Sequence, residues 1–392
     1  MMIIKLAFRN LIGAGLRTWL NVFVLSLAFV VIIWTQGFIE GMNRYAMSAK
    51  TDAEVGGGQY WHRMYDPYDP LTLEDSHALL SPALAGLVER GDATPILVTT
   101  GAIYPEGRVR SVLLKGIDPE QDVLNLPTGA LAGAETDAIP ALIGAQTAEQ
   151  TKLAIGDYVT VRWRDVNGTF DADDIRIAQI MHTTVPSVDQ GQIWIPIQRL
   201  RGMLQAPEEA TLVVLRKGLR DAPDGGTDWI HRTPDYLLSD IRELVKMKSA
   251  SINILYGLLL LMGLLAIFDT QVLSIWRRRK EIGTLMALGM ERIRVIVLFT
   301  FEGALHGLFA LAIGAVYGIP ILALTLRSGL SMPEMAASTG VAVPEVLYPH
   351  YGFRLVLGTT VLVLIAITVV SYLPATKIAR LKPTEALRGK RS

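Results

Sequence analysis

Long apolar stretches alternate with polar segments along this chain. Four stretches, 18–39, 249–268, 295–326 and 355–376, are apolar enough to cross a bilayer core of about 30 Å, which takes roughly 20 helical residues. The segment 44–248 contains short runs of alternating apolar and polar residues instead. The pattern predicts a multi-pass α-helical membrane protein with four transmembrane helices and a large α+β domain between helices 1 and 2.

The segment 44–248 has the signals of both strands and helices. Residues 158–163 and 175–180 alternate on either side of Asn167-Gly168, which predicts a hairpin. Further strands are expected at 111–115, 193–195 and 211–215, and helices at 81–90, 144–152 and 197–204. An uninterrupted helix is expected from Tyr236 to Tyr256; it either carries motion between the domain and the second span or merely anchors the domain.

Composition supports membrane insertion. The chain is 51% apolar and 19% charged, with a mean hydropathy of +0.35, which is too apolar for an ordinary soluble enzyme. The absence of cysteine removes disulfides, thiolate metal sites and a cysteine nucleophile.

The net charge of zero hides a segregation of charge. Segments 1–17, 276–294 and 377–392 are basic, whereas 44–248 has more acidic than basic residues. The positive-inside rule therefore places both termini and 276–294 in the cytoplasm and the large domain outside. The basic patches beside apolar runs do not form a nucleic-acid footprint. The first apolar run is longer than a cleaved signal peptide requires, which favours a retained anchor.

These signals predict the following division of the chain: an N-terminal interfacial helix and first span (1–43), an extracytoplasmic α+β domain (44–248), the second span (249–275), a cytoplasmic loop (276–294), the third span (295–326), an external loop (327–354), the fourth span (355–376) and a cytoplasmic tail (377–392).

Signals of catalysis are weak. The sequence has no phosphate-binding P-loop and no G-x-S-x-G nucleophile elbow. Its six histidines are dispersed, and Asp165, Asp171 and Asp173 fit an acidic hairpin tip better than a calcium loop. We expect no catalytic, cofactor or metal site in this chain, and so no enzyme.

An aromatic-rich stretch follows the first span and contains Tyr60, Trp61, Tyr65 and Tyr68. These side chains either line an entry for a lipid or apolar substrate, or form an interfacial belt or ordinary core. Three ionisable residues lie in or near the spans, where charge is costly: Glu302 and His306 could pair on one face of the third span, and Asp269 is expected near Arg277–Arg279.

The cytoplasmic loop has the most specific pattern. Ile282, Leu285 and Met286 form a small apolar face at helical spacing, bounded by basic residues and by Gly289. This predicts a short helix that presents its apolar face to a groove on a partner. The alternative is a solvated basic loop that only sets topology.

The sequence resembles the FtsX-like permeases of ABC transporters, including macrolide-exporter-type and lipoprotein-releasing-type subunits. Three motifs carry the resemblance: residues 6–11 (LAFRNL) with Arg17-Thr18, residues 279–289 (RKEIGTLMALG) with Phe301-Glu302-Gly303, and Pro374-Ala375 with residues 379–388 (ARLKPTEALR). It implies a coupling helix that binds the ATPase through Arg279, Lys280, Glu281, Ile282, Gly283, Leu285, Met286, Leu288 and Gly289.

The resemblance also implies partners and a location. Two copies of a separate ABC ATPase would bind ATP and Mg²⁺, and a second permease, identical or homologous, would complete a complex in the bacterial inner membrane, in contact with lipids. The favoured function is release of lipoproteins, driven by motion transmitted across the membrane. Drug or peptide efflux with a periplasmic adaptor, or signalling to a cell-wall hydrolase without transport, are the alternatives.

Overall fold

The computed structural model describes residues 16–132, 138–183, 185–219, 222–331 and 346–379. They divide into two compact units, a helical bundle (16–43, 245–331 and 346–379) and a sheet domain (the described residues of 44–244). The predicted interfacial helix, the first motif up to residue 15, residues 332–345 of the 327–354 loop and the tail beyond 379 lie outside the described residues.

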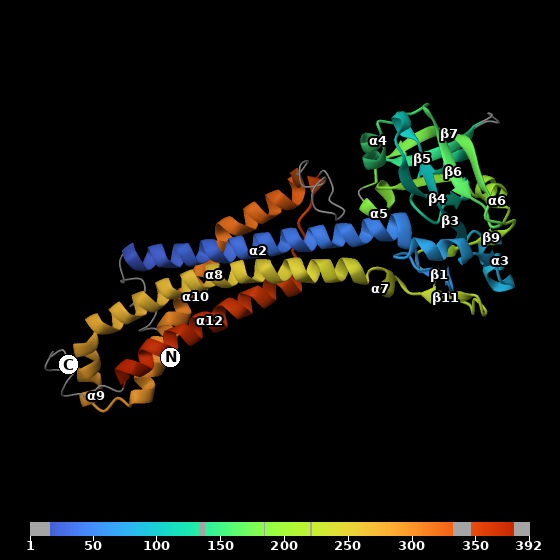
Figure 1. Cartoon of the computed structure of the whole chain (residues 1–392). Coiled ribbons are helices and arrows are strands. Elements are labelled where there is room, and N and C mark those ends of the chain that lie inside the picture. The colour runs from blue at the N-terminus through green and yellow to red at the C-terminus, as the bar shows by residue number, and fades with distance from the viewer. Residues whose placement is uncertain (1–15, 133–137, 184, 220–221, 332–345, 380–392) are drawn as a thin grey trace. The chain divides into compact units, whose positions relative to one another are not determined.

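Four long helices build the bundle. They are α2 (Leu16–Lys50), α8 (Ser239–Arg277), α10 (Arg292–Ser328) and α12 (Phe353–Ala379), and each contains a stretch long and apolar enough to cross a membrane. In Figure 1 they run side by side within the bundle. A short helix, α9 (Arg279–Ala287), joins α8 to α10, and a small ladder pairs β12 (Leu330–Ser331) with β13 (Val346–Leu347).

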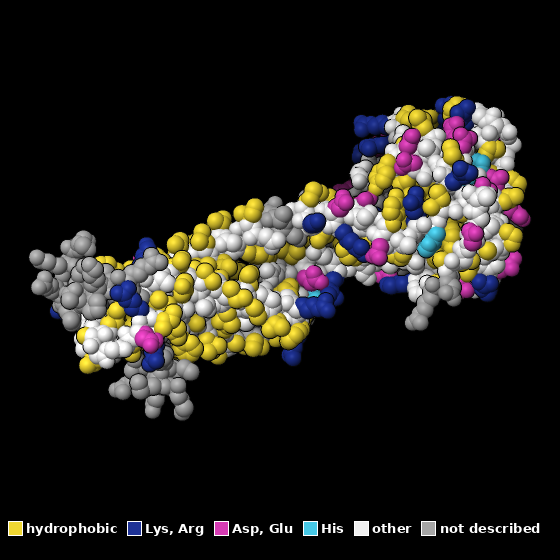
Figure 2. All heavy atoms as spheres, turned by 90° about the horizontal axis from the view of Figure 1, so that it is seen from below, with side chains coloured by type: hydrophobic (Ala, Val, Ile, Leu, Met, Phe, Trp, Pro, Cys, Tyr) yellow, Lys and Arg dark blue, Asp and Glu magenta, His cyan; other side chains and the backbone are white. Residues whose placement is uncertain are grey.

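The bundle packs through apolar contacts and a few polar ones. Leu25, Ile267 and Ile367 belong to one buried cluster contributed by α2, α8 and α12. The Asn21 amide donates to the backbone oxygen of Ala266 at 3.2 Å. The outward faces of the helices remain apolar and exposed, and Figure 2 shows hydrophobic side chains covering much of this surface. An exposed surface of this kind suits lipid rather than water.

The sheet domain has nine strands in the order β11-β1-β10-β3-β4-β8-β5-β7-β6. A further pairing of β3 with β6 closes the last six of them into a barrel, whereas β10, β1 and β11 extend the sheet beyond it. The bounds are β1 (Gln59–His62), β3 (Ala93–Ile103), β4 (Arg110–Ile117), β5 (Ile139–Gly144), β6 (Tyr158–Arg164), β7 (Phe170–Met181), β8 (Gln192–Pro196), β10 (Leu212–Leu215) and β11 (Trp229–Arg232). A separate ladder pairs β2 (Ala78–Leu79) with β9 (Glu209–Ala210).

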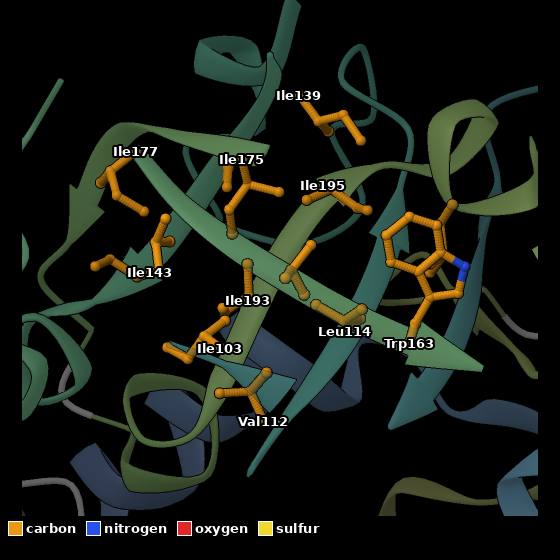
Figure 3. Packing of buried hydrophobic residues seen from close by; sticks show 14 of the residues in the cluster. Ile103, Val112, Leu114, Ile139, Ile143, Trp163, Ile175, Ile177, Ile193 and Ile195 are labelled. Atoms are coloured by element: carbon orange, nitrogen blue, oxygen red, sulfur yellow. The ribbon is translucent and has the colours of Figure 1, made fainter. Parts of the chain in front are cut away.

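The barrel interior is filled by side chains from alternate strand positions. Leu114, Ile193 and Ile195 are fully buried there, and Figure 3 shows aliphatic side chains converging with Trp163. The Trp163 indole donates to the backbone oxygen of Met203 at 2.8 Å. These side chains fill the interior of the six-stranded barrel, so the barrel has no room for a ligand.

Short helices cover the sheet. They are α3 (Pro82–Glu89), α4 (Ala145–Thr151), α5 (Pro186–Asp189), α6 (Ile197–Leu204) and α7 (Pro234–Leu237), with the π-helical turn η1 (Thr51–Val55) and the 3-10 turns η2 (Pro70–Asp75), η3 (Pro105–Gly107) and η4 (Thr128–Ala132). The predicted strands and helices of this domain are found within a few residues of the expected bounds, and the predicted fold class of four apolar helices with a mixed α+β domain is confirmed.

The expectation of one uninterrupted helix from Tyr236 to Tyr256 is wrong. The helix breaks at Leu238, which separates α7 from α8 and has φ −98° and ψ 2°. Thr233 caps α7 by accepting from the Tyr236 amide, so a separate short helix starts before the long one. The helical spacing of Leu237, Ile241, Leu244 and Val245 continues across the break, so the sequence pattern did not mark it.

Candidate functional site

The predicted cytoplasmic helix exists as α9, Arg279–Ala287, at the end of the bundle where α8 ends and α10 begins (Figure 1). Its apolar side faces the bundle. Ile282 is 3% exposed and packs in a cluster with Ile275 of α8, Val295 and Phe299 of α10 and Ala375 of α12. Helix α9 is therefore seated on three of the four long helices.

This seating corrects one expectation. Ile282 was expected to face a partner, but it is used inside the chain, and Met286 is half-buried against the same cluster. The long apolar helices of the same chain bury the small apolar face of α9, because they adjoin it whether or not a partner protein is bound. The surface that α9 leaves outward holds Glu281 and Thr284, followed by Leu288, which is 80% exposed.

The remaining coupling residues are partly placed. Lys280 is exposed, Gly283 is buried, and Gly289 follows the helix with φ 95°, a conformation that glycine adopts without strain. The side chains of Arg279 and Leu285 are not among the described ones. The structure thus shows the helix and its seat, and the role of these residues toward an ATPase stays a prediction.

A charged group anchors the same corner of the bundle. Arg278, at the junction of α8 and α9, forms ion pairs of 3.1 Å with Glu281 and with Glu302 of α10. The Glu302 side chain is 5% exposed, and Arg278 also lies over the Phe299 ring at 5.4 Å. One guanidinium therefore ties the start of α9 to the third long helix.

The expected pair of Glu302 and His306 takes a different form. The Glu302 carboxylate pairs with Arg278, and His306 contacts the backbone oxygen of Glu302 through Nδ1 at 2.8 Å. Around them, buried polar atoms of Gln271 and Ser371 have no hydrogen-bond partner among the described residues. The bundle thus has a polar interior here. Asp269 is exposed, and no ion pair joins it to Arg277 or Arg278.

The aromatic stretch after the first span splits between two faces of the sheet domain. Tyr60 is 1% exposed, stacks on His231 and donates its hydroxyl to the backbone oxygen of Pro223. Tyr60 is therefore a core residue, which is the second of the two alternatives for this stretch. Trp61, Tyr65 and Tyr68 instead line a cavity of about 380 Å³.

This cavity, called the aromatic pocket below, is lined by residues that directly follow or precede the spans in sequence. Lys50 and Glu54 end the first span's helix and its π-helical extension, and Tyr236 and Asp240 lie at α7 and the start of α8. Its volume falls in the range of about 300–1,000 Å³ typical of small-molecule sites. The pocket belongs wholly to the sheet domain.

Two ring contacts and one hydrogen bond hold the pocket's aromatic wall. Trp61 packs edge-on against Tyr65, with ring centroids 5.2 Å apart, and Arg232 lies 4.6 Å from the Tyr236 ring centroid. The Tyr68 hydroxyl donates to the Asp240 carboxylate, which raises the pKa of Tyr68 to about 12. Burial raises the pKa of Tyr65 as well, so both phenols stay protonated at neutral pH.

The pocket floor contains two residues that sequence reasoning missed. Lys115 of β4 and Trp194 of β8 are register neighbours, and Lys115 Nζ lies 4.9 Å from the indole centroid. Lys115 is 6% exposed and Trp194 1%. The alternation of β4, with Leu114 inside the barrel, already placed Lys115 on the opposite face. A lysine at the end of the predicted strand 111–115, directly after two leucines, was the signal that could have marked it.

No metal site emerges from the described residues: they contain no group of three or more histidine, cysteine, aspartate or glutamate side chains that could hold an ion. The acidic tip of the β6–β7 hairpin behaves as expected, since Asp165 Oδ1 accepts hydrogen bonds from the backbone amides of Asn167 and Thr169. It is a turn, closed by its own backbone.

Comparison with known proteins identifies the C-terminal part of the chain. Residues 253–383 match the FtsX-like permease C-terminal domain; this segment includes most of α8 and all of α9 and α10. An uncharacterized ABC transporter permease of Methanocaldococcus jannaschii is 26% identical over 165 residues, which are 42% of this chain and 39% of that protein. The match therefore spans less than half of the relative's length. The chain has an FtsX-like permease domain and is homologous to an ABC transporter permease.

Two solved structures are similar to the chain in part. The periplasmic region of MacB from Actinobacillus actinomycetemcomitans aligns with 47% of this chain and 92% of its own, at 11% identity and a TM-score of 0.32. The extracellular domain of the noncanonic ABC-type transporter YknZ from Gram-positive bacteria aligns with 42% and 84%, at 13% identity and a TM-score of 0.26.

Proposed function

We propose that this chain is the permease subunit of an ABC transporter, coupled through α9 to a separate ATPase. The observation that carries the proposal is the match of residues 253–383 to the FtsX-like permease C-terminal domain, a segment that contains α9. The packing of Ile282 against three long helices supports this coupling, because a force applied to α9 is transmitted through these contacts to α8, α10 and α12. The Arg278–Glu302 pair stiffens the same connection.

In this proposal the ATPase, in two copies, supplies ATP and Mg²⁺, and a second permease completes the complex. Both termini and α9 lie in the cytoplasm of a bacterial cell, with the sheet domain outside the inner membrane. Motion of the bundle moves the sheet domain through the chain segments that join them, α2 and α8. The substrate is hydrophobic, with lipoprotein release favoured over drug or peptide efflux with an adaptor.

The exposed side of α9 provides the test. We expect Leu288→Asp to abolish association with the ATPase, because a carboxylate replaces an exposed leucine that a partner would bury. Leu71→Asp is the matched control, since Leu71 is 84% exposed in the sheet domain. Each tagged variant is purified in mild detergent from native membranes, and the ATPase is identified by mass spectrometry and by ATP hydrolysis.

The expected result is an ATPase bound to the unmodified chain and to Leu71→Asp, and lost from Leu288→Asp at equal membrane levels. Retention of the ATPase by Leu288→Asp would remove α9 from the interface. An unmodified chain without any ATPase would overturn the proposal as a whole. A cell-wall hydrolase recovered together with the ATPase would favour signalling over transport.

A further inference from the structure

Lys115 has an unusual position for a lysine. It is 6% exposed and lines the aromatic pocket. Among the described residues no carboxylate lies within ion-pair distance of its ammonium. The Trp194 ring is its close contact. Buried lysines are rarely found without a partner, because the charged form loses its hydration.

The carboxylates of the pocket are already engaged elsewhere. Ser187 Oγ donates to Glu54 Oε2 at 2.6 Å, and Tyr68 donates to Asp240. Lys50 adds a second basic group to the lining. Both carboxylates therefore already accept a hydrogen bond, whereas no described residue accepts one from the Lys115 ammonium. The group that the pocket lacks is an anion that would pair with Lys115.

Two residues beside Lys115 also have buried polar atoms without a hydrogen-bond partner. Trp194 Nε1 and Gln192 Oε1 are buried, and neither has a hydrogen-bond partner among the described residues. Both residues are on β8, the strand beside Lys115, and both line the pocket. The Lys115 ammonium can donate to the acidic oxygens of a ligand, and the indole N–H and amide oxygen beside it show that the described protein groups leave polar atoms here unsatisfied.

The rest of the lining is apolar or aromatic. Trp61, Tyr65, Ile96, Leu113 and Leu212 contribute to the walls, and such surfaces take hydrocarbon. A ligand that satisfies both parts has an acidic head and an apolar body. A free inorganic anion would leave the aromatic walls unused, and a neutral hydrocarbon would leave Lys115 uncompensated.

We propose that the aromatic pocket binds an amphiphile with one anionic head group, a carboxylate or a phosphate monoester, which pairs with Lys115 while its apolar chain lies against Trp61 and Trp194. Burial lowers the pKa of Lys115, although the Glu54 carboxylate opposes the shift; a bound anion raises it again. That this amphiphile is the transported substrate rests on the proposed function. Its binding to the pocket does not require the ATPase.

Binding is tested on the full chain in a non-ionic detergent by native mass spectrometry, which counts protein that retains one added ligand. The probes are dodecanoate, dodecyl phosphate, uncharged dodecanol and inorganic phosphate. We expect the two anionic amphiphiles to bind at least about tenfold more tightly than dodecanol, since hydrogen bonds to charged groups are the stronger ones. Inorganic phosphate is expected not to bind. The tighter of the two anionic amphiphiles identifies the head group.

Lys115→Met is expected to weaken binding of both anionic amphiphiles at least about tenfold and to leave dodecanol unchanged, whereas Lys115→Arg retains most of the affinity. Lys152→Met is the matched control. Lys152 is exposed, its ammonium lies 3.3 Å from the Glu106 carboxylate, and neither residue lines the aromatic pocket. Equal binding of dodecanoate and dodecanol by the unmodified chain would overturn the proposal without any variant, as would unchanged affinity in a folded Lys115→Met. Neither result bears on the ATPase experiment, so the two proposals fail separately.

Discussion

The helical bundle and the sheet domain use similar aliphatic residues in opposite arrangements. In the sheet domain, Leu114 and Ile193 are fully buried, whereas most of the described charged residues are exposed or half-buried. In the bundle, large apolar side chains such as Leu362 are exposed, and Glu302 and Gln271 are buried. Water expels apolar surface inward, whereas lipid accepts it and leaves polar groups to find one another inside.

The comparison makes the exceptions informative. Lys115 is a buried cation in the sheet domain, and unlike the buried Asp165 and Asp189, which accept hydrogen bonds from backbone amides, it pairs with no carboxylate among the described residues. Asp269 is an exposed carboxylate on a helix whose surroundings are apolar. Each residue differs from the charge pattern of its own unit. Each lowers the free energy of unfolding, because a charged group is placed in apolar surroundings and apolar packing does not compensate for its lost hydration. Lys115 also lies in a pocket beside a donor and an acceptor without hydrogen-bond partners, and this combination indicates a ligand.

The largest expected effect separates the two apolar surfaces. Leu114→Ala leaves a cavity in the barrel and should lower the free energy of unfolding of the sheet domain by about 2–5 kcal/mol. Leu362→Ala, at a position 59% exposed on α12, should change stability by about 0.5 kcal/mol or less. Thermal unfolding in detergent, followed by near-ultraviolet circular dichroism, measures both. Equal losses would mean that Leu362 is buried against protein and not against lipid.

A smaller effect is expected for charge pairs. Glu302→Gln leaves Arg278 without its buried partner and should cost about 3 kcal/mol, near the lower end for a broken buried pair, because Arg278 keeps Glu281. Glu106→Gln removes an exposed partner of Lys152 and should cost about 1 kcal/mol at most.

The melting temperatures of both variants, measured at the same detergent concentration, give the comparison. Arg278→Gln combined with Glu302→Gln should recover part of the loss, since no uncompensated charge then remains in the bundle. A Glu302→Gln variant as stable as Glu106→Gln would show that water reaches the Arg278 corner.

The smallest expected effect is a pH dependence confined to the sheet domain. Burial lowers the pKa of His62 below 6.5, its ordinary value, and the Asp228 carboxylate opposes the shift. The unfolded chain therefore binds a proton more readily than the folded domain, so stability declines as the pH falls below about 6.5.

Unfolding of the sheet domain at pH 7 and at pH 5 measures this loss. His62→Gln should reduce the difference between the two pH values, and the exposed His182→Gln should leave it unchanged. An identical pH slope in both variants would assign the acid sensitivity to other groups. The bundle melting transition should not follow the protonation of His62.

Much of the fold could be predicted from the sequence because its signals are local. A run of apolar residues predicts a span whatever surrounds it, and alternation predicted the β6–β7 hairpin with its turn at Asn167-Gly168. The short helix after Arg278 was predicted from spacing and found as α9. The α7–α8 break was missed, because the helical spacing of Leu237, Ile241 and Leu244 continues through the change of backbone conformation at Leu238.

The candidate sites depended more on contacts between distant segments. The apolar face of α9 was predicted correctly as a face, but which surface it meets depends on Val295 and Ala375, far along the chain. Tyr60 and Trp61 are adjacent in β1, and only the pairing and packing of that strand decide that one is core and the other lines a pocket.

The sequence by itself determined the four apolar helices, the mixed α+β domain and the short helix in the loop 276–294, because hydrophobic periodicity and turn residues act over a few neighbouring positions. Only the tertiary structure decided the seat of Ile282, the pairing of Arg278 with Glu302, and the burial of Lys115 beside Trp194. Those contacts join residues from separate helices and strands, and the energy of a buried charge depends on the groups that the fold brings around it.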